Sequence, residues 1–538
     1  MKIQPTAYIR LILTLLGGWF LVTAMVSCKK ETPKKEEPIP FVRLLKDRQF
    51  KSNILKRDID YAVLLPAEYE NSNDSFPVVY LLHGFGDNET AWITGGLIQY
   101  YVDQNAASTV PMIYVMPVGF NSYYVNKYNG QYPYMDMFVN ELVPLVDSLF
   151  RTKTDPNQRA VMGYSMGGYG AMIMPVKNPD VFKTGVALSM SFRTNEQYLD
   201  EPQSVFDYQW GPIFGGYGMS GEARFTDYFK QYSPFQFLQN TDDQSMTGLN
   251  LFFDCGDDEE SLSETNNLLH SMLRDRSIKH EYRMRSGYHS WDYWKKSLPE
   301  ALKYISYAVQ QKPYPDENNL LDYGVEISSD KILLHQVEAS EQIYHVVLPS
   351  DYSTTTSDYP VILVFHDEEI NVPPQVSNKI LSLLNNQIVA AKLPASIIVE
   401  VPVGASQPDQ DVIQKLINEV DAEYRISDKR EEWIAIGNKN GGRLAFDLVS
   451  QHSEKIHACL LFDALLPDNP DITDTSIIYY LDITDEGLQY KTNNELYLNL
   501  RKNEVPHEYR VRQGLASDND FLNGIFEAIG FINKNLKS

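Results

Sequence analysis

Short runs of apolar residues alternate with segments of helical spacing along most of the chain from residue 58 onward. The runs 77–82, 112–117 and 159–162 are almost uninterrupted, whereas 137–150 places its apolar residues at helical intervals. Continuous apolar strands between helices are typical of a parallel sheet that is buried on both faces. The pattern therefore predicts an α/β fold with a mainly parallel sheet and helices on both of its faces.

The same series of segments occurs twice in the chain. The strand-like segments 343–349, 360–366 and 397–404 repeat 61–66, 77–83 and 113–119 in order, and His507–Arg512 repeats His280–Arg285. This order predicts a tandem duplication with a smaller second copy. We expect a first domain at 41–310 with an insertion at 191–244, a linker at 311–325 and a second domain at 326–538.

The N-terminus has the features of a targeting segment. Basic residues precede an apolar run that ends at Cys28, and Met25–Cys28 resembles the lipobox of bacterial lipoproteins. The sequence predicts a signal peptide at 1–27, lipidation of Cys28 and a charged tether at 28–40. We expect a lipid-anchored protein of the bacterial cell envelope, at the periplasmic face or surface of the outer membrane. The alternative is a signal anchor with an incidental cysteine.

Composition excludes several classes of protein. The chain has 47 basic and 71 acidic residues and a net charge of −24, which argues against a nucleic-acid binder. Its three cysteines exclude a disulfide framework and a Cys-rich zinc site. We expect neither a metal nor another cofactor.

The strongest chemical motif is Gly163-Tyr164-Ser165-Met166-Gly167, which directly follows a predicted strand and precedes a predicted helix. This context is typical of a nucleophile elbow, a sharp turn that lifts the serine hydroxyl above the sheet. The amide of Met166 then points to where an oxyanion would form. Alternatively, Ser165 merely caps a helix.

Three further segments fit serine chemistry. His83–Gly86 follows a buried strand and offers the amide of Phe85 as a second oxyanion donor. His289, late in the first copy, is a candidate general base, because a serine hydroxyl needs one near neutral pH. The acidic run after Gly256 offers Asp258 or Glu259 to orient the imidazole, and both remain open.

Together the four motifs resemble the family of esterase D and of feruloyl and acetyl-xylan esterases, carbohydrate esterase family 1. The resemblance covers residues 50–308 and implies an α/β-hydrolase fold and a serine carboxylic-ester hydrolase; with the internal repeat, the fold class expected is tandem α/β-hydrolase folds. In this family the acid usually stands three residues after the glycine, which is Glu259 here; a shift of one residue gives Asp258.

The resemblance also implies a substrate class, namely acetyl or feruloyl esters on polysaccharide or oligosaccharide. Alternatives are hydrolysis of siderophore or other acyl esters, acyl transfer, a peptidase, and a non-catalytic glycan-binding lipoprotein. Trp92, Tyr164 and Trp291 are candidate substrate-binding aromatics, and core packing is the alternative for them.

The second copy lacks the chemistry of the first. Alignment of the repeats puts Lys439 at the position of Ser165 and Ala516 at that of His289, while Gly437 and Gly441 keep the turn. His366-Asp367-Glu368-Glu369 replaces the His83–Gly86 loop, and its acids would repel an oxyanion. The sequence therefore predicts a degenerate, non-catalytic second domain.

Overall fold

The structure is a computed structural model that describes residues 42–240, 246–315, 319–367, 375–404, 408 and 410–536. The predicted signal peptide, the tether and Cys28 lie outside these residues. In the part of the chain described, no helix is both long and apolar enough to cross a membrane. Residues 43–538 form one compact unit.

The first repeat is built on eight strands: six form a parallel sheet, and the antiparallel pair β1 and β2 extends it at one edge. From one edge to the other the order is β1-β2-β4-β3-β5-β6-β7-β8. β2 pairs antiparallel with β4, and the strands from β4 to β8 are parallel to one another. The strands are Leu44–Ser52 (β1), Arg57–Leu64 (β2), Val78–Leu82 (β3), Ile113–Pro117 (β4), Arg159–Tyr164 (β5), Thr184–Leu188 (β6), Asn250–Gly256 (β7) and Glu281–Arg285 (β8).

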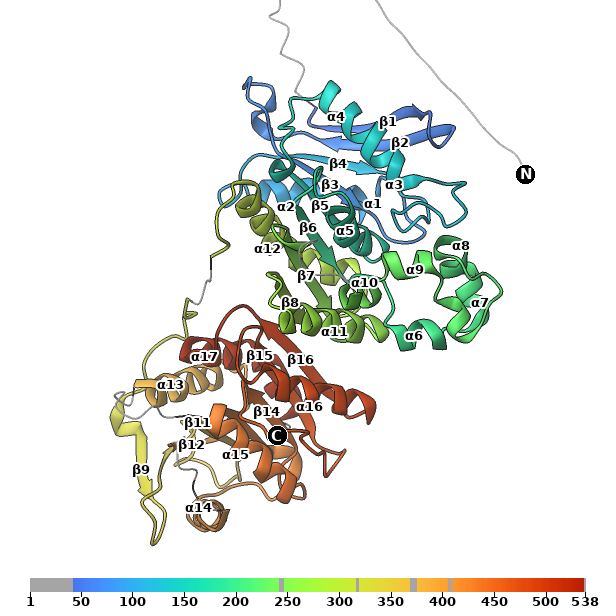
Figure 1. The fold of residues 1–538 in the computed structure, drawn as a ribbon. Helices are drawn as coiled ribbons and strands as arrows, with labels where there is room; N and C mark the ends of the chain where they lie inside the picture. Colours follow the sequence, from blue (N-terminus) through green and yellow to red (C-terminus); the bar gives the residue numbers. More distant parts are fainter. Residues whose placement is uncertain are drawn as a thin grey trace, which may run out of the picture. The chain divides into compact units, whose positions relative to one another are not determined.

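Helices cover this sheet because its central strands are apolar on both faces; every residue of β3, β4, β5 and β6 is buried. Figure 1 shows α6 to α9, which belong to the predicted insertion, grouped to one side of the strands of the first repeat. The helices are Ala91–Thr94 (α1), Ile98–Gln104 (α2), Tyr134–Met137 (α3), Val143–Leu149 (α4), Met166–Lys177 (α5), Asn195–Asp200 (α6), Gln203–Val205 (α7), Gly211–Phe214 (α8), Asp227–Tyr232 (α9), Pro234–Asn240 (α10), Ser261–Asp275 (α11) and Trp291–Val309 (α12).

The second repeat has the same strand order, β9-β10-β12-β11-β13-β14-β15-β16, with β10 antiparallel to β12. Its strands are Ile332–Gln336 (β9), Ile343–Val347 (β10), Val361–Asp367 (β11), Ile397–Val403 (β12), Trp433–Asn438 (β13), Ala458–Phe462 (β14), Ile478–Thr484 (β15) and His507–Arg512 (β16). Its helices are Gln375–Val389 (α13), Gln410–Glu423 (α14), Lys439–Gln451 (α15), Tyr490–Lys502 (α16), Asp518–Glu527 (α17) and Ile529–Asn535 (α18). The predicted α/β class is confirmed, and both copies follow one plan.

Candidate active site

Ser165 lies in the turn that joins β5 to α5. Its φ of 57° and ψ of −121° lie outside the helix and strand regions, as a nucleophile elbow requires. A Cβ on Gly163 would lie 2.1 Å from the carbonyl oxygen of Gly167, and one on Gly167 would lie 2.2 Å from that of Leu82. Only glycine fits at these two positions, so the motif's glycines permit the close packing of helix, turn and neighbouring strand.

The structure brings three of the predicted residues into one hydrogen-bonded chain. Nε2 of His289 lies 2.9 Å from Oγ of Ser165, and Nδ1 of the same ring lies 2.7 Å from Oε2 of Glu259. Glu259 is fully buried, whereas the His289 side chain is 37% exposed. The imidazole can therefore exchange a proton with the serine while its far side is fixed by a carboxylate.

The other carboxylate oxygen of Glu259 is hydrogen-bonded by residues of the first repeat. Oε1 accepts hydrogen bonds from Oγ of Ser189 at 2.6 Å and from the backbone N–H of Gly256 at 2.9 Å. Nε1 of Trp294 in turn donates to Oγ of Ser189 over 2.8 Å. Sequence reasoning missed Ser189 and Trp294, because a buried serine after a strand and a tryptophan on a helix carry no motif of their own.

Asp258 was the other candidate acid, and the structure does not bring it to His289. Its side chain is exposed, and its backbone N–H donates to the carbonyl oxygen of Gly287 over 3.2 Å. Partial burial raises the pKa of its carboxyl, against the opposing charges of His507 and Arg501. The turn after β7 points successive side chains to opposite sides, and so Glu259 faces inward and Asp258 outward.

The two amides expected to bind an oxyanion lie on segments that meet at Ser165. Met166 is the first residue of α5, where backbone N–H groups lack partners within the helix. On the other side, a Cβ on Gly84 would lie 3.4 Å from Cβ of Ser165, so the His83–Phe85 loop packs against the nucleophile. Both segments thus lie next to Ser165, and the role of their amides as oxyanion donors stays a prediction.

His83 fixes this loop, a role that its sequence motif did not reveal. Its Nδ1 lies 2.7 Å from the carbonyl oxygen of Gly84, and its Nε2 accepts from the N–H of Gly119 at 2.7 Å. Burial lowers the pKa of the imidazole, which favours the neutral ring. A neutral ring with its proton on Nδ1 satisfies both bonds.

Two of the three aromatic residues predicted to bind substrate are core residues, and that prediction is wrong for them. Tyr164 and Trp92 are each 1% exposed, and their rings contact each other at 5.4 Å between centroids. Both belong to one buried apolar cluster, and the Tyr164 hydroxyl donates to Asp87. Trp291 is half-buried against Trp92, and its predicted contact with substrate stays a prediction.

Other aromatic side chains lie at the surface near the site. The ring of Phe85 contacts that of Tyr208, from the insertion, at 5.8 Å. Tyr208 is 70% exposed, and Tyr288, next to His289, is 68% exposed. By contrast Trp210 and Phe214 of the insertion are buried and hold it together. Exposed rings beside a reactive serine are suited to stack on a flat apolar group.

The equivalent turn of the second repeat keeps its shape without the chemistry. Lys439 has a φ of 45°. A Cβ on Gly441 would lie 2.1 Å from the carbonyl oxygen of Phe365, just as one on Gly167 would lie 2.2 Å from that of Leu82. Asp463, at the position of Ser189, accepts from the N–H and the hydroxyl of Thr484 at 2.9 and 3.0 Å. An internal carboxylate thus occupies the place where the first repeat supports Glu259. Glu368 and Glu369 lie outside the described residues.

Metal ligands do not cluster in the described part of the chain: it contains no group of three or more His, Cys, Asp or Glu residues placed to hold a metal ion. Cys255 and Cys459 are buried free thiols, and burial raises their pKa values.

Comparison with known proteins gives matches to ester hydrolases. Residues 52–305 match the model of a family described as "Putative esterase". The chain is 32% identical over 153 residues to an endo-1,4-beta-xylanase/feruloyl esterase of Xylanibacter ruminicola, an alignment that covers 27% of this chain and 21% of the relative. It is 23% identical over 275 residues to an acetyl esterase of Caldicellulosiruptor saccharolyticus, and this alignment covers 48% of this chain and 96% of the relative.

Solved structures give similar matches. A ferulic acid esterase aligns with a TM-score of 0.42 and 24% identity over 49% of this chain and 98% of its own. The S-formylglutathione hydrolase FrmB of Staphylococcus aureus aligns with a TM-score of 0.39 and 20% identity over 49% of this chain and 100% of its own.

Proposed function

We propose that residues 52–305, which match the family model described as "Putative esterase", form a serine esterase that hydrolyses carboxylic esters of saccharides. The observation that carries the proposal is the hydrogen-bonded chain from Ser165 through His289 to Glu259. A serine hydroxyl bonded to an imidazole, which is itself bonded to a carboxylate, is the arrangement that activates serine for acyl transfer.

In the proposed reaction Oγ of Ser165 attacks the ester carbonyl carbon while Nε2 of His289 takes the hydroxyl proton. The amides of Phe85 and Met166 stabilise the oxyanion of the tetrahedral intermediate. The intermediate collapses as His289 returns the proton to the departing alcohol oxygen. Water then attacks the acyl-enzyme and gives a proton to His289, and the second tetrahedral intermediate collapses as His289 returns that proton to Oγ of Ser165 and the carboxylic acid leaves. Glu259 stabilises the imidazolium in both halves of the cycle.

For the acyl group we propose acetyl or feruloyl, since relatives carry the names feruloyl esterase and acetyl esterase. The exposed rings of Tyr208 and Tyr288 support an aromatic acyl group or a sugar ring beside the nucleophile. Lipidation at Cys28 and attachment to the outer membrane would place this activity on glycans outside the cytoplasm. The second repeat, with Lys439 and Ala516 at the key positions, would be non-catalytic.

The test compares the intact protein with its Ser165→Ala variant on two substrates, acetylated xylan and a feruloylated arabinoxylan oligosaccharide. We expect release of acetate or ferulate by the wild-type protein and loss of at least about 1,000-fold in the variant, with unchanged circular dichroism. Equal release by both proteins would refute the proposal. A Lys439→Ala variant is the control and should retain full activity.

A further inference from the structure

The two repeats meet through equivalent strands. β8 and β16 pair antiparallel, with Met284 opposite Val511. In the neighbouring helices α11 and α16, Nδ2 of Asn267 donates to Oδ1 of Asn494, its counterpart in the repeat, over 2.5 Å. Contact between the same patch on two copies is the isologous arrangement of a two-fold dimer. The seam between the repeats therefore has pseudo-two-fold symmetry within one chain.

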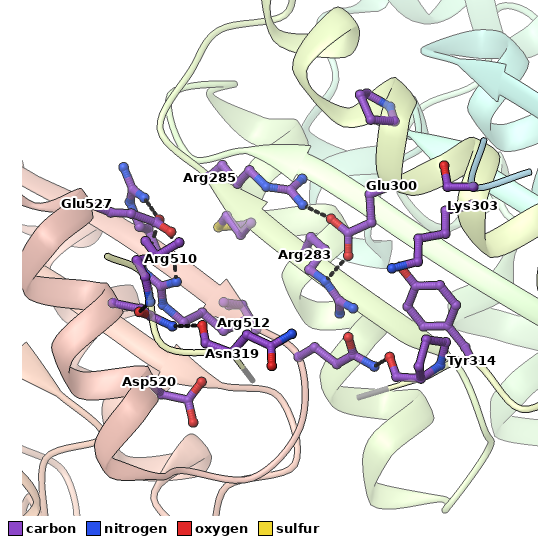
Figure 2. A pocket seen from close by; sticks show the side chains of 18 of the residues that line it. Arg283, Arg285, Glu300, Lys303, Tyr314, Asn319, Arg510, Arg512, Asp520 and Glu527 are labelled. Carbon is purple, nitrogen blue, oxygen red and sulfur yellow. Dashed lines mark hydrogen bonds and ion pairs between the residues drawn. The ribbon is translucent and has the colours of Figure 1, made fainter. Parts of the chain in front are cut away.

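The two sides of the seam carry corresponding ion pairs, and one further pair, Arg283 with Asp485 at 3.5 Å, crosses it. Arg285 pairs with Asp254 and Glu300, and Arg512 pairs with Asp482 and Glu527. Figure 2 shows the arginines of both strands around a shared cavity of about 540 Å³, with Glu300 on one side and Glu527 on the other. Because these pairs are alike in the two repeats, they do not distinguish the functional copy from the degenerate one.

Two other arginines, which correspond to each other, cross the seam. Arg501 of α16 donates from Nη1 to the carbonyl oxygen of Asp257 at 3.0 Å and from Nη2 to that of Glu260 at 2.5 Å. Its counterpart Arg274 of α11 donates to the carbonyl oxygens of Asp485 and Gly487 at 2.9 and 2.7 Å. The bonds are alike, but only those of Arg501 fall on the turn that carries Glu259.

The turn held by Arg501 is the one on which the catalytic geometry depends. Asp257 and Glu260 directly flank Asp258 and Glu259, so the guanidinium spans the turn from end to end. Glu260 has a φ of 47°, in the left-handed region that non-glycine residues seldom adopt. Such a conformation persists where surrounding contacts impose it, and the bond to its carbonyl oxygen is one of them.

A second crossing contact joins this turn to the histidine loop. Oδ2 of Asp257 accepts from the N–H of Tyr509 in β16 at 2.9 Å, and its Oδ1 accepts from the N–H of Gly287 at 3.0 Å. Gly287 stands two residues before His289. One buried carboxylate thus ties the degenerate repeat to both loops that carry the acid and the base.

From this asymmetry we propose that the second repeat acts as a built-in partner that holds the acid and base of the first repeat in register, with Arg501 as the main positioning residue. The proposal rests on the proposed function, because it assigns Arg501 a role through Glu259. The two bonds of Arg501 go to backbone carbonyl oxygens of the turn and not to Ser165 or His289.

The experiment compares Arg501→Ala with the matched variant Arg274→Ala in the intact protein. Both remove equivalent bonds across one seam, so both should lower the melting temperature by similar amounts. We expect kcat for p-nitrophenyl acetate to fall up to about 100-fold in Arg501→Ala with little change in KM, because a displacement of about 1 Å at the site has such an effect. In Arg274→Ala we expect kcat within about two-fold of wild type.

A double-mutant cycle separates positioning from general weakening. If Arg501 acts through Glu259, Arg501→Ala should change kcat by less than about three-fold in a Glu259→Gln background. Arg501→Lys, which keeps a cation able to reach one of the two carbonyl oxygens, should recover part of kcat and guards against misfolding of the alanine variant.

Hydrogen–deuterium exchange gives a readout that does not need turnover. We expect faster exchange in the peptide 254–262 for Arg501→Ala, and in 482–490 instead for Arg274→Ala. Equal losses of kcat in the two alanine variants, or unchanged exchange in 254–262, would overturn the positioning role. A wild-type protein without ester hydrolysis would instead refute the proposed function, and exchange would still decide whether Arg501 holds the turn.

Discussion

Replacement of Glu259 by glutamine tests whether this carboxylate sets the tautomer of His289. Oε1 of Glu259 accepts two hydrogen bonds, from Ser189 and from the backbone of Gly256, and only Oε2 faces Nδ1 of His289. In Glu259→Gln the amide oxygen can keep both bonds at the Oε1 position. The NH2 group then faces Nδ1, which must become an acceptor, and the ring proton moves to Nε2.

A proton on Nε2 prevents the ring from accepting the proton of Ser165. The corresponding acid-to-amide change in serine proteases lowers kcat by about 10,000-fold, which corresponds to about 5.5 kcal/mol of transition-state stabilisation. We expect a loss of this order for p-nitrophenyl acetate at pH 7.5. The unfolding midpoint in urea should change little, because the two bonds that anchor the turn are kept.

Asp258→Asn is the matched control for this change. It removes a carboxylate one position away that is exposed and does not contact His289, and its kcat should stay within about two-fold of wild type. If Asp258→Asn lost activity and Glu259→Gln retained it, the assignment of the acid would be refuted.

Three further predictions concern the surroundings of the two turns. Burial raises the pKa of Asp463 to about 7, although the two hydrogen bonds from Thr484 act to lower it. Between its unfolded pKa and about 7 this carboxyl takes up a proton on folding, so its contribution to stability is lost as pH rises through about 7. Asp463→Asn keeps an acceptor for both bonds and should be more stable than wild type at pH 8 but not near pH 4, by urea unfolding; identical pH dependence in the two proteins would contradict this. His83→Ala removes the partners of Gly119 and Gly84 and should lower the free energy of unfolding by about 1–3 kcal/mol and also lower kcat, whereas a loss of stability alone would argue against a role in the oxyanion loop. Tyr208→Ala should raise KM for feruloyl esters about 3- to 10-fold and leave acetyl esters unaffected, and equal effects on both would exclude stacking on the acyl group.

The repeated α/β plan was predictable because buried parallel strands leave contiguous apolar runs, as in 77–82 and 360–366. The positions of Ser165 and His289 followed from motifs in which neighbouring glycines and strands restrict the backbone. The choice between Asp258 and Glu259 could not be made from a motif, because it depends on the direction of each side chain in a four-residue turn.

Other features need tertiary contacts that no local pattern records. Tyr164 and Trp92 are of a residue type common in binding sites, yet both are buried in the core, since aromatic residues serve equally in cores and in clefts. The match of His280–Arg285 with His507–Arg512 revealed the duplication, but not that these two strands pair with each other. Consequently the contacts of Arg501 with the turn around Glu259 emerge only in the folded chain.

The most direct measurement is peptide mapping by mass spectrometry after the intact protein reacts with a fluorophosphonate, which modifies serines activated by a neighbouring base. The account predicts a single adduct on Ser165, its absence from Ser165→Ala and its strong reduction in His289→Ala. An unmodified Ser165 in folded wild-type protein, or equal modification of Ser165 when His289 is removed, would contradict it.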